Sequence, residues 1–153
     1  MQNHIRPAKP EDAGRIAEIE IFNYRLQFYP IFKNDAFYFE ELQVLPAAET
    51  LRNDPVRLAQ TFVYDDGVVK GFVRMDGTRV EKLFVEPVLQ GQGIGSTLLA
   101  FAVQTCGANR LWALEKNTRA IAFYQRHGFV LTGNKEPEDD TEEFLVEMAR
   151  PKE

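Results

Sequence analysis

An apolar segment followed by closely spaced glycines occupies residues 80–96, which read Val80-Glu81-Lys82-Leu83-Phe84-Val85-Glu86-Pro87-Val88-Leu89-Gln90-Gly91-Gln92-Gly93-Ile94-Gly95-Ser96. The first half predicts a β-strand that ends at Pro87, because proline cannot donate to a strand ladder. The three glycines predict a tight loop that turns directly into a helix. The free N–H groups of such a loop converge on one point. Together with the helix dipole, they favour an anion such as a diphosphate.

The residues before this segment predict one strand, several helices and an antiparallel meander. A short strand is expected at 4–7, and a helix opens at Pro10, where proline and two acids suit a first turn. Aromatic residues crowd the stretch 24–54, which predicts one or two helices broken near Pro30 and Pro46. Alternating apolar residues between turns then predict three strands, at 61–64, 68–75 and 78–85.

The residues after the glycines alternate between helices and strands. A helix is expected from Gly93 to Cys106, since one of its faces is apolar and Gly107 stands at the usual stop position. The remaining expected elements are a strand at 111–114, a helix at 117–127, and a last hairpin formed by 129–132 and 144–148. The element order is β-α-α-β-β-β-α-β-α-β-β. It predicts a mixed α/β sheet in a single domain over residues 1–153.

Composition excludes several classes of protein. The chain of 153 residues is 44% hydrophobic and 27% charged, which is ordinary for a globular protein and argues against disorder. Its lone cysteine, Cys106, can form no internal disulfide, and with two histidines the chain is not expected to hold a metal. Neither a signal peptide nor a long apolar run is visible, so no membrane association is expected. A cytoplasmic location is the expectation.

Charge is uneven along the chain. The net charge is −5, from 23 acids and 18 basic residues, and six of the acids lie in the segment 136–143. No basic stripe is visible, which argues against binding to nucleic acid. Two interpretations of the acidic segment remain open. It is either a solvated hairpin loop or a means of attracting a cationic substrate to the mouth of a cleft.

Three phosphate-binding patterns compete for the glycine-rich loop. A P-loop needs a lysine just before its serine or threonine, and Gly95-Ser96-Thr97 has none. A dinucleotide fingerprint needs Gly-x-Gly-x-x-Gly/Ala, and counting from Gly91 places Ser96 at the third position. The strand before the loop also ends an antiparallel meander, whereas that fingerprint belongs to a parallel unit. The third pattern is Gln/Arg-x-x-Gly-x-Gly/Ala, which Gln90-Gly91-Gln92-Gly93-Ile94-Gly95 matches.

This third pattern resembles the acyl-CoA loop of the GNAT superfamily of N-acetyltransferases, and Leu-Phe-Val-x-Pro precedes it at the family's spacing. The opening residues 5–12 are similar to the family's first strand and helix. A later segment resembles a second element of the family: Asn117-Thr118-Arg119-Ala120-Ile121-Ala122-Phe123-Tyr124-Gln125-Arg126-His127-Gly128-Phe129. The matches cover most of residues 4–131 and leave 24–60 as a divergent insert. The implied fold is GNAT-like, with a mostly antiparallel central sheet and helices on both faces.

The resemblance implies a set of cofactor contacts and acetyl-CoA as co-substrate, without a metal. The backbone of one strand is expected to hold the pantetheine arm: Leu83, Phe84 and Val85. The diphosphate is expected on the loop and the first turn of the helix: Gln90, Gly91, Gln92, Gly93, Ile94, Gly95 and Ser96. Asn117 matches an asparagine that contacts the cofactor in the family. The basic residue usual in the loop is missing, so the backbone alone is expected to bind the phosphates.

Two side chains are candidates for moving protons. At pH 7 only about one in 10³ lysine-like amines is neutral and able to attack a thioester. A base that removes the proton from the ammonium is therefore useful. Glu81 is the candidate base, since a period of two places it on the strand face of Leu83 and Val85; Glu115 is a second choice. Tyr124 matches the tyrosine that donates a proton to the leaving thiolate in the family.

The predicted function is N-acetylation of a primary amine by direct transfer from acetyl-CoA. The backbone amide of Val85 is the expected donor to the oxyanion. Cys106 lies late on its helix, away from the thioester, which argues against an acyl-enzyme. The acceptor, a small-molecule or peptide amine, cannot be identified from the residues, and the alternative is a non-catalytic acyl-CoA binding module. The family often pairs through sheet edges or helices, so a homodimer is one expectation for the oligomeric state.

Overall fold

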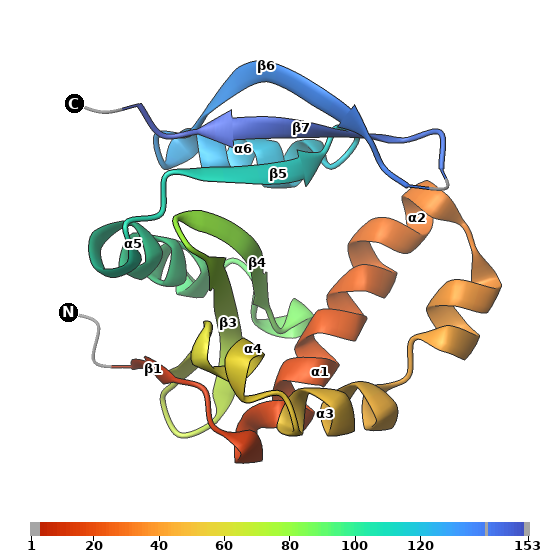
Figure 1. Ribbon diagram of the computed structural model, residues 1–153, viewed down its shortest axis with the longest axis vertical. Helices are drawn as coiled ribbons and strands as arrows, with labels where there is room; N and C mark the ends of the chain where they lie inside the picture. Colours follow the sequence, from red (N-terminus) through yellow and green to blue (C-terminus); the bar gives the residue numbers. More distant parts are fainter. Residues whose placement is uncertain (1–3, 140, 152–153) are drawn as a thin grey trace.

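A seven-stranded sheet in the order β1-β2-β3-β4-β5-β7-β6 forms the centre of the protein (Figure 1). The computed structural model describes residues 4–139 and 141–151. Neighbouring strands are antiparallel except β4 and β5, which run parallel. The strands are β1 (Ile5–Pro7), β2 (Thr61–Asp65), β3 (Val69–Asp76), β4 (Arg79–Val85), β5 (Arg110–Leu114), β6 (Val130–Pro137) and β7 (Phe144–Ala149). The predicted mixed sheet with helices is confirmed.

Helices connect the strands and cover both faces of the sheet. They are α1 (Ala13–Asn23), α2 (Tyr29–Phe32), α3 (Val44–Arg52), α4 (Pro55–Ala59), α5 (Ile94–Cys106) and α6 (Thr118–Arg126). Short 3-10 turns span Pro10–Asp12 and Pro87–Leu89. Among the described residues, no helix is long and apolar enough to cross a bilayer. Within the same residues, no group of three metal-binding side chains comes together.

The aromatic-rich insert folds differently from the prediction. A π-helical turn, Tyr24–Phe28, joins α1 to α2 as one continuous rod, and a second π-helical segment spans Ala36–Glu41 (Figure 1). Pro30 lies inside the rod, which ends two residues later at Phe32, whereas Pro46 lies in the first turn of α3 and does not break it. A first-turn residue needs no N–H donor, so proline is tolerated there.

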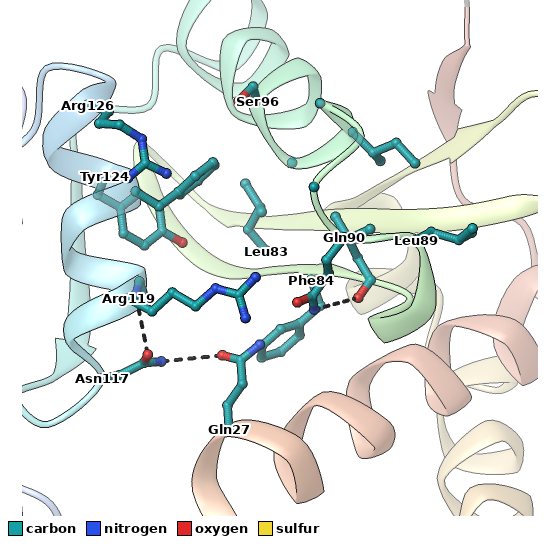
Figure 2. Close-up of a pocket in the computed structure, with 17 residues that line it drawn as sticks. Gln27, Leu83, Phe84, Leu89, Gln90, Ser96, Asn117, Arg119, Tyr124 and Arg126 are labelled. Carbon is teal, nitrogen blue, oxygen red and sulfur yellow. Dashed lines mark hydrogen bonds between the residues drawn. The ribbon is translucent and has the colours of Figure 1, made fainter.

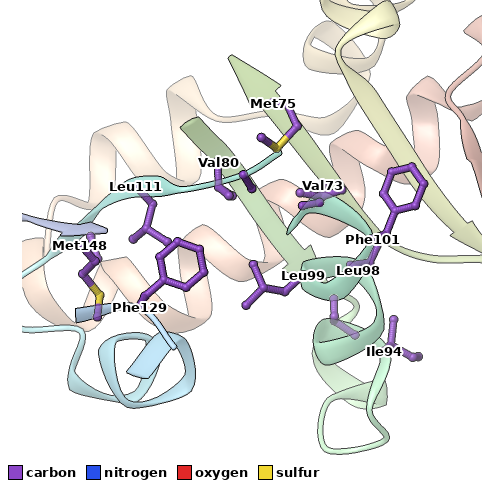
Figure 3. Close-up of a cluster of buried hydrophobic side chains, with 14 residues drawn as sticks. Val73, Met75, Val80, Ile94, Leu98, Leu99, Phe101, Leu111, Phe129 and Met148 are labelled. Atoms are coloured by element: carbon purple, nitrogen blue, oxygen red, sulfur yellow. The ribbon is translucent and has the colours of Figure 1, made fainter. Parts of the chain in front are cut away.

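Two apolar clusters seat the helices on the sheet. Ile16, Ile19 and Leu58 pack with Phe72 and Phe84 on the side of α1, α3 and α4. On the other side, α5 packs against β3, β4 and the strands beyond; Figure 3 shows this cluster, which includes Val73, Val80, Leu98, Leu99, Leu111, Phe129 and Met148. Gly71 lets α5 approach β3 closely, since a Cβ there would lie 3.0 Å from the Leu98 Cδ1 atom. The helix α5 is therefore packed closely against β3.

The sheet splits between β4 and β5. Only two residue pairs join these strands, Arg79 with Arg110 and Val80 with Leu111. Beyond Val80 the two strands diverge, as Figure 1 shows where β4 curves away beneath β5. This fork leaves the C-terminal half of β4 without a partner on one edge, and the candidate site lies there.

A β-bulge interrupts β4 at Glu81. On β3, Arg74 pairs with Lys82 while the next residue, Met75, pairs with Val80, so Glu81 has no partner. A bulge breaks the period of two along its strand. The alternation that placed Glu81 on the face of Leu83 and Val85 therefore does not hold through this position.

Candidate active site

A cavity of about 340 Å³ lies in the fork between β4 and β5. Figure 2 shows its walls: β4 behind, the glycine loop and the start of α5 on one side, α6 on the other, and Gln27 below. The residues that line it are Gln27, Leu83, Phe84, Val85, Leu89, Gln90, Gly91, Gly93, Ile94, Gly95, Ser96, Asn117, Arg119, Ala120, Phe123, Tyr124 and Arg126. Most of the predicted cofactor residues therefore meet around one hollow; Gln92 does not line it.

The backbone of β4 presents polar groups to this cavity. In an antiparallel pair, the N–H and C=O groups of successive residues face alternate edges. The Glu86 N–H donates to the Lys70 carbonyl on the β3 side (2.9 Å), so the polar groups of Val85 face the opposite, open edge. The same alternation turns those of Leu83 to the open edge and those of Phe84 toward β3. Leu83 and Val85 can therefore bind an extended ligand arm through their backbone.

The glycine loop presents the uncapped start of α5 to the cavity. Gly91 and Gly93 have φ angles of 85° and 84°, a left-handed conformation that favours glycine. Gly93 is the N-cap, and no side chain caps the helix. The N–H groups of Ile94, Gly95 and Ser96 therefore remain available, at the positive end of the helix dipole, for an anion. The expected geometry of an anion site is present.

A buried asparagine ties the loop to α1 and β4. Asn23 is fully buried, and its Nδ2 donates to the Val85 carbonyl (2.8 Å) and to the Ile19 carbonyl (2.8 Å). Its Oδ1 accepts from the amide groups of Gln27 (2.8 Å) and Gln90 (2.9 Å). This network fixes Gln90, the first residue of the loop motif, against the end of β4. Asn23 is not among the residues selected from the sequence, because its partners lie far away along the chain.

Asn117 joins the two sides of the fork. Its Oδ1 accepts from the Ala120 N–H (3.3 Å) and so caps α6, as its position before the helix predicts. Its Nδ2 donates to the Gln27 Oε1 across the cavity (3.3 Å; Figure 2). A side chain thus placed at the cavity edge can also meet a ligand.

Tyr124 projects from α6 into the cavity, where Figure 2 shows its hydroxyl turned toward Leu83. Its ring packs against Phe123 and Phe129, with centroids 5.3 and 5.9 Å away. Burial raises the pKa of its hydroxyl well above the usual value near 10. No described group hydrogen-bonds to this hydroxyl, so it is available to a ligand as a proton donor.

The two candidate bases lie apart from the cavity lining. Glu81 sits at the bulge on β4, where its charge helps to raise the pKa of Tyr24 and opposes the lowering that burial imposes on the pKa of Lys82. Glu115 is exposed and pairs with Lys135 (2.9 Å). Neither carboxylate lines the cavity, and a proton path from the cavity to Glu81 would need intervening water.

Two arginines on α6 line the cavity although the sequence analysis did not select them. Arg119 and Arg126 are the only charged side chains among the described residues that line it. They stand seven residues apart, a spacing that places both on one face of a helix with Tyr124 and Phe123 nearby. That spacing was the available signal, on the same helix as the predicted Asn117 and Tyr124.

A contact between Ser96 and His127 locks α6 to the first turn of α5. The Ser96 Oγ and His127 Nε2 atoms are 3.0 Å apart. Burial and the neighbouring Arg126 charge lower the pKa of His127, so the ring is neutral at pH 7. Cys106, at the far end of α5, packs against the apolar cluster, as expected of a structural thiol.

A second hollow of about 660 Å³ lies where α2 and the π-helical segment meet the acidic loop between β6 and β7. Aromatic side chains form one wall, among them Phe32, Phe37 and Tyr38. The other wall is acidic: Glu138, Asp139, Glu142 and Glu143. Asp140, part of the predicted acidic segment, lies outside the described residues.

Comparisons with known proteins identify the family. A family model described as "Acetyltransferase (GNAT) domain" matches residues 57–131. The peptidyl-lysine N-acetyltransferase YjaB of Salmonella typhimurium is 30% identical over 139 residues, which cover 91% of each chain. The chain belongs to the GNAT acetyltransferase family. This GNAT membership confirms the prediction of an acetyl-CoA-dependent N-acetyltransferase over the alternative of a binding module.

Solved structures share this GNAT fold. The apo form of YjaB from Escherichia coli superposes with a TM-score of 0.73 at 23% identity, covering 95% of both chains. PaiA N-acetyltransferase from Thermoplasma acidophilum, solved in complex with coenzyme A, superposes with a TM-score of 0.70 at 22% identity, covering 94% of this chain and 96% of that one. The predicted fold is therefore confirmed.

We predict that Asn23→Ala destabilises the protein by about 1–3 kcal/mol, because the Val85 carbonyl and two amide side chains lose a buried partner. Asn53→Ala, which removes an exposed side chain bonded to Glu49, is the matched control. Its effect should stay within about 0.5 kcal/mol. Urea denaturation measures both, and equal losses would contradict the role given to Asn23.

Proposed function

We propose that this GNAT enzyme transfers the acetyl group of acetyl-CoA to the side-chain amine of a lysine in a peptide or protein. The observation that carries the proposal is the cavity in the fork, because it joins an anion site, an open strand edge and a tyrosine hydroxyl. YjaB, the relative described above, is a peptidyl-lysine N-acetyltransferase. That name supports lysine as the acceptor over a free small-molecule amine.

Acetyl-CoA would lie along the fork with its diphosphate at the start of α5. The N–H groups of Ile94, Gly95 and Ser96 suit the diphosphate, and the loop residues from Gln90 surround it. The pantetheine arm would then run along the open edge of β4, where Leu83 offers its N–H and carbonyl and Val85 offers its N–H, because Asn23 already binds the Val85 carbonyl. Asn117 would contact the arm from the start of α6.

The lysine enters as an ammonium, so its nitrogen loses two protons in all, and the departing thiolate takes up one. The neutral amine attacks the thioester carbon, and the Val85 N–H at the open edge stabilises the oxyanion that forms. The C–S bond then breaks, and Tyr124 gives its proton to the departing thiolate. We assign to Glu81, reached through water, the proton that the ammonium loses before the attack; the proton that nitrogen loses after the attack replaces the one that Tyr124 has given away. The support for Glu81 is its negative charge and its place on β4, two residues before Leu83.

The burial of Tyr124 suits this role. Because its pKa is raised, the Tyr124 hydroxyl stays protonated near neutral pH and can donate its proton. A thiolate leaving into the same low-dielectric cavity is destabilised in the same way, so its affinity for a proton rises as well.

The acidic hollow supports a cationic acceptor. Its carboxylates attract a basic peptide electrostatically, and its aromatic wall offers apolar contact to a lysine stem. Glu143 is already paired with Lys116 (3.1 Å), which leaves Glu138, Asp139 and Glu142 as the acids that face a ligand.

The direct test is an acetylation assay with acetyl-CoA. A lysine-containing peptide with a blocked N-terminus, the same peptide with arginine in place of lysine, and a polyamine are each supplied as acceptor. Thiol release and a peptide mass increase of one acetyl group are expected with the lysine peptide only. Turnover of the polyamine alone would contradict the proposed acceptor, and no thiol release with any acceptor would contradict the proposed function.

Tyr124→Phe should lower kcat about 10²-fold and leave the Kd for CoA unchanged, because it removes only the proton donor. Tyr64→Phe, on β2 away from the cavity, is the control and should keep full activity. The raised pKa also predicts no loss of wild-type kcat through tyrosine ionisation below about pH 10. An unchanged kcat in Tyr124→Phe would exclude Tyr124 as the acid.

Neutralising the acidic hollow should raise KM for a basic peptide. The triple change Glu138→Gln, Asp139→Asn and Glu142→Gln removes the unpaired carboxylates. We expect about a tenfold increase in KM at low salt, smaller at high salt because ions screen the attraction. The KM for acetyl-CoA should not change.

The control carries the same change in charge elsewhere on the surface. Glu11→Gln, Glu49→Gln and Asp76→Asn alter three exposed acids outside both hollows. If this control raises the peptide KM as much as the variant of the acidic hollow, net charge explains the effect and the hollow has no part in it.

We further propose a cytoplasmic location and a single domain over residues 1–153. A lone, partly buried cysteine fits a reducing compartment. A homodimer stays a prediction, which light scattering would decide.

A further inference from the structure

The cavity receives positive charge from a helix and not from its glycine loop. No lysine or arginine occurs between Glu86 and Arg110, a stretch that contains the whole loop. Arg119 and Arg126 instead reach the cavity from α6, and no acidic side chain among the described residues lines it. Figure 2 shows the Arg119 guanidinium extended across the opening toward Gln90.

Both guanidinium groups are free to take a ligand. Neither makes an ion pair or a side-chain hydrogen bond within the described residues, whereas Arg6, Arg15 and Arg74 are all paired with carboxylates. Arg126 lies over the Phe123 ring, with its Cζ 6.0 Å from the centroid. The ring orients this guanidinium without neutralising it.

The wall that carries these arginines is fixed relative to the anion site. The Ser96–His127 contact of 3.0 Å holds the C-terminal end of α6 at the first turn of α5. Gly95 lies so close to α6 that a Cβ there would be 3.5 Å from the Phe123 ring. Arg126 therefore flanks the first turn of α5, and Arg119 stands about 10 Å further along α6 at a rise of 1.5 Å per residue.

We propose that Arg119 and Arg126 bind the phosphate groups of CoA from the α6 wall and supply the cations that the glycine loop lacks. This inference rests on the proposed function, since it concerns the same cavity. A guanidinium donates two parallel hydrogen bonds to a phosphate, which suits it better than a lysine to this task. The backbone amides of α5 and the two arginines would thus hold the phosphates from opposite sides.

The test measures CoA binding by calorimetry for Arg119→Gln, Arg126→Gln and the double variant. Each single change should raise the Kd about tenfold, and the double change more, because a charge-assisted contact is lost each time. Arg52→Gln is the matched control, since Arg52 is an exposed arginine on α3 that pairs with Glu49. It should leave the Kd unchanged.

Two further ligands separate phosphate binding from other effects. Acetyl-pantetheine lacks every phosphate, so the variants should match the wild type in kcat/KM with it. Dephospho-CoA lacks only the 3′-phosphate. A loss of affinity that persists with it assigns the arginines to the diphosphate, and a loss that vanishes assigns them to the 3′-phosphate; either result supports the proposal.

The outcomes distinguish this inference from the proposed function. Normal CoA binding by the double variant overturns the inference and leaves the proposed function standing. An equal loss with acetyl-pantetheine, or an equal loss in Arg52→Gln, overturns it as well. A wild-type protein that does not bind CoA would overturn both.

Discussion

The site depends on the unpaired edge of β4. The C-terminal half of this strand has no neighbouring strand on one side, so its backbone polar groups there lack partners within the sheet. Buried N–H and C=O groups must find partners. The strands β4 and β5 share only two residue pairs. One orphaned carbonyl, that of Val85, is taken by Asn23. The other groups at the open edge are left to a ligand, so the unpaired strand and the substrate site are the same feature.

Much of this region could be predicted because the signals are local. Pro87 ends a strand, and Gly91 and Gly93 adopt the left-handed angles for which glycine is suited. Asn117 caps α6 as its position indicates. The ends of most strands and helices also fall within one or two residues of the prediction. The helical rod does end just after Pro30, at Phe32. Pro46 was misjudged because proline breaks a helix interior but fits a first turn, and the pattern alone does not say which turn is first.

The rest of the site depends on contacts between distant segments. Asn23 meets Gln90 across 67 positions, and Gln27 meets Asn117 across 90. The hydrophobic periodicity of the sequence does not predict contacts between residues so far apart. The arginines of α6 were overlooked for the same reason, since they complete a site whose motif, Gln90 to Gly95, lies well before them in the chain. Local patterns thus located the loop, and tertiary packing determined which side chains face it.

The bulge at Glu81 has an evolutionary consequence. In a regular strand, two residues five positions apart face opposite sides of the sheet. Because of the unpaired residue at the bulge, Val80 and Val85 instead pack in the same apolar cluster. Removing a residue here would restore regular alternation and turn every side chain on one half of β4 to the wrong side. Selection should therefore act on the number of residues between Val80 and Val85 more strictly than on their identities. Lineages of this chain are expected to diverge here by substitution, never by a single-codon gap.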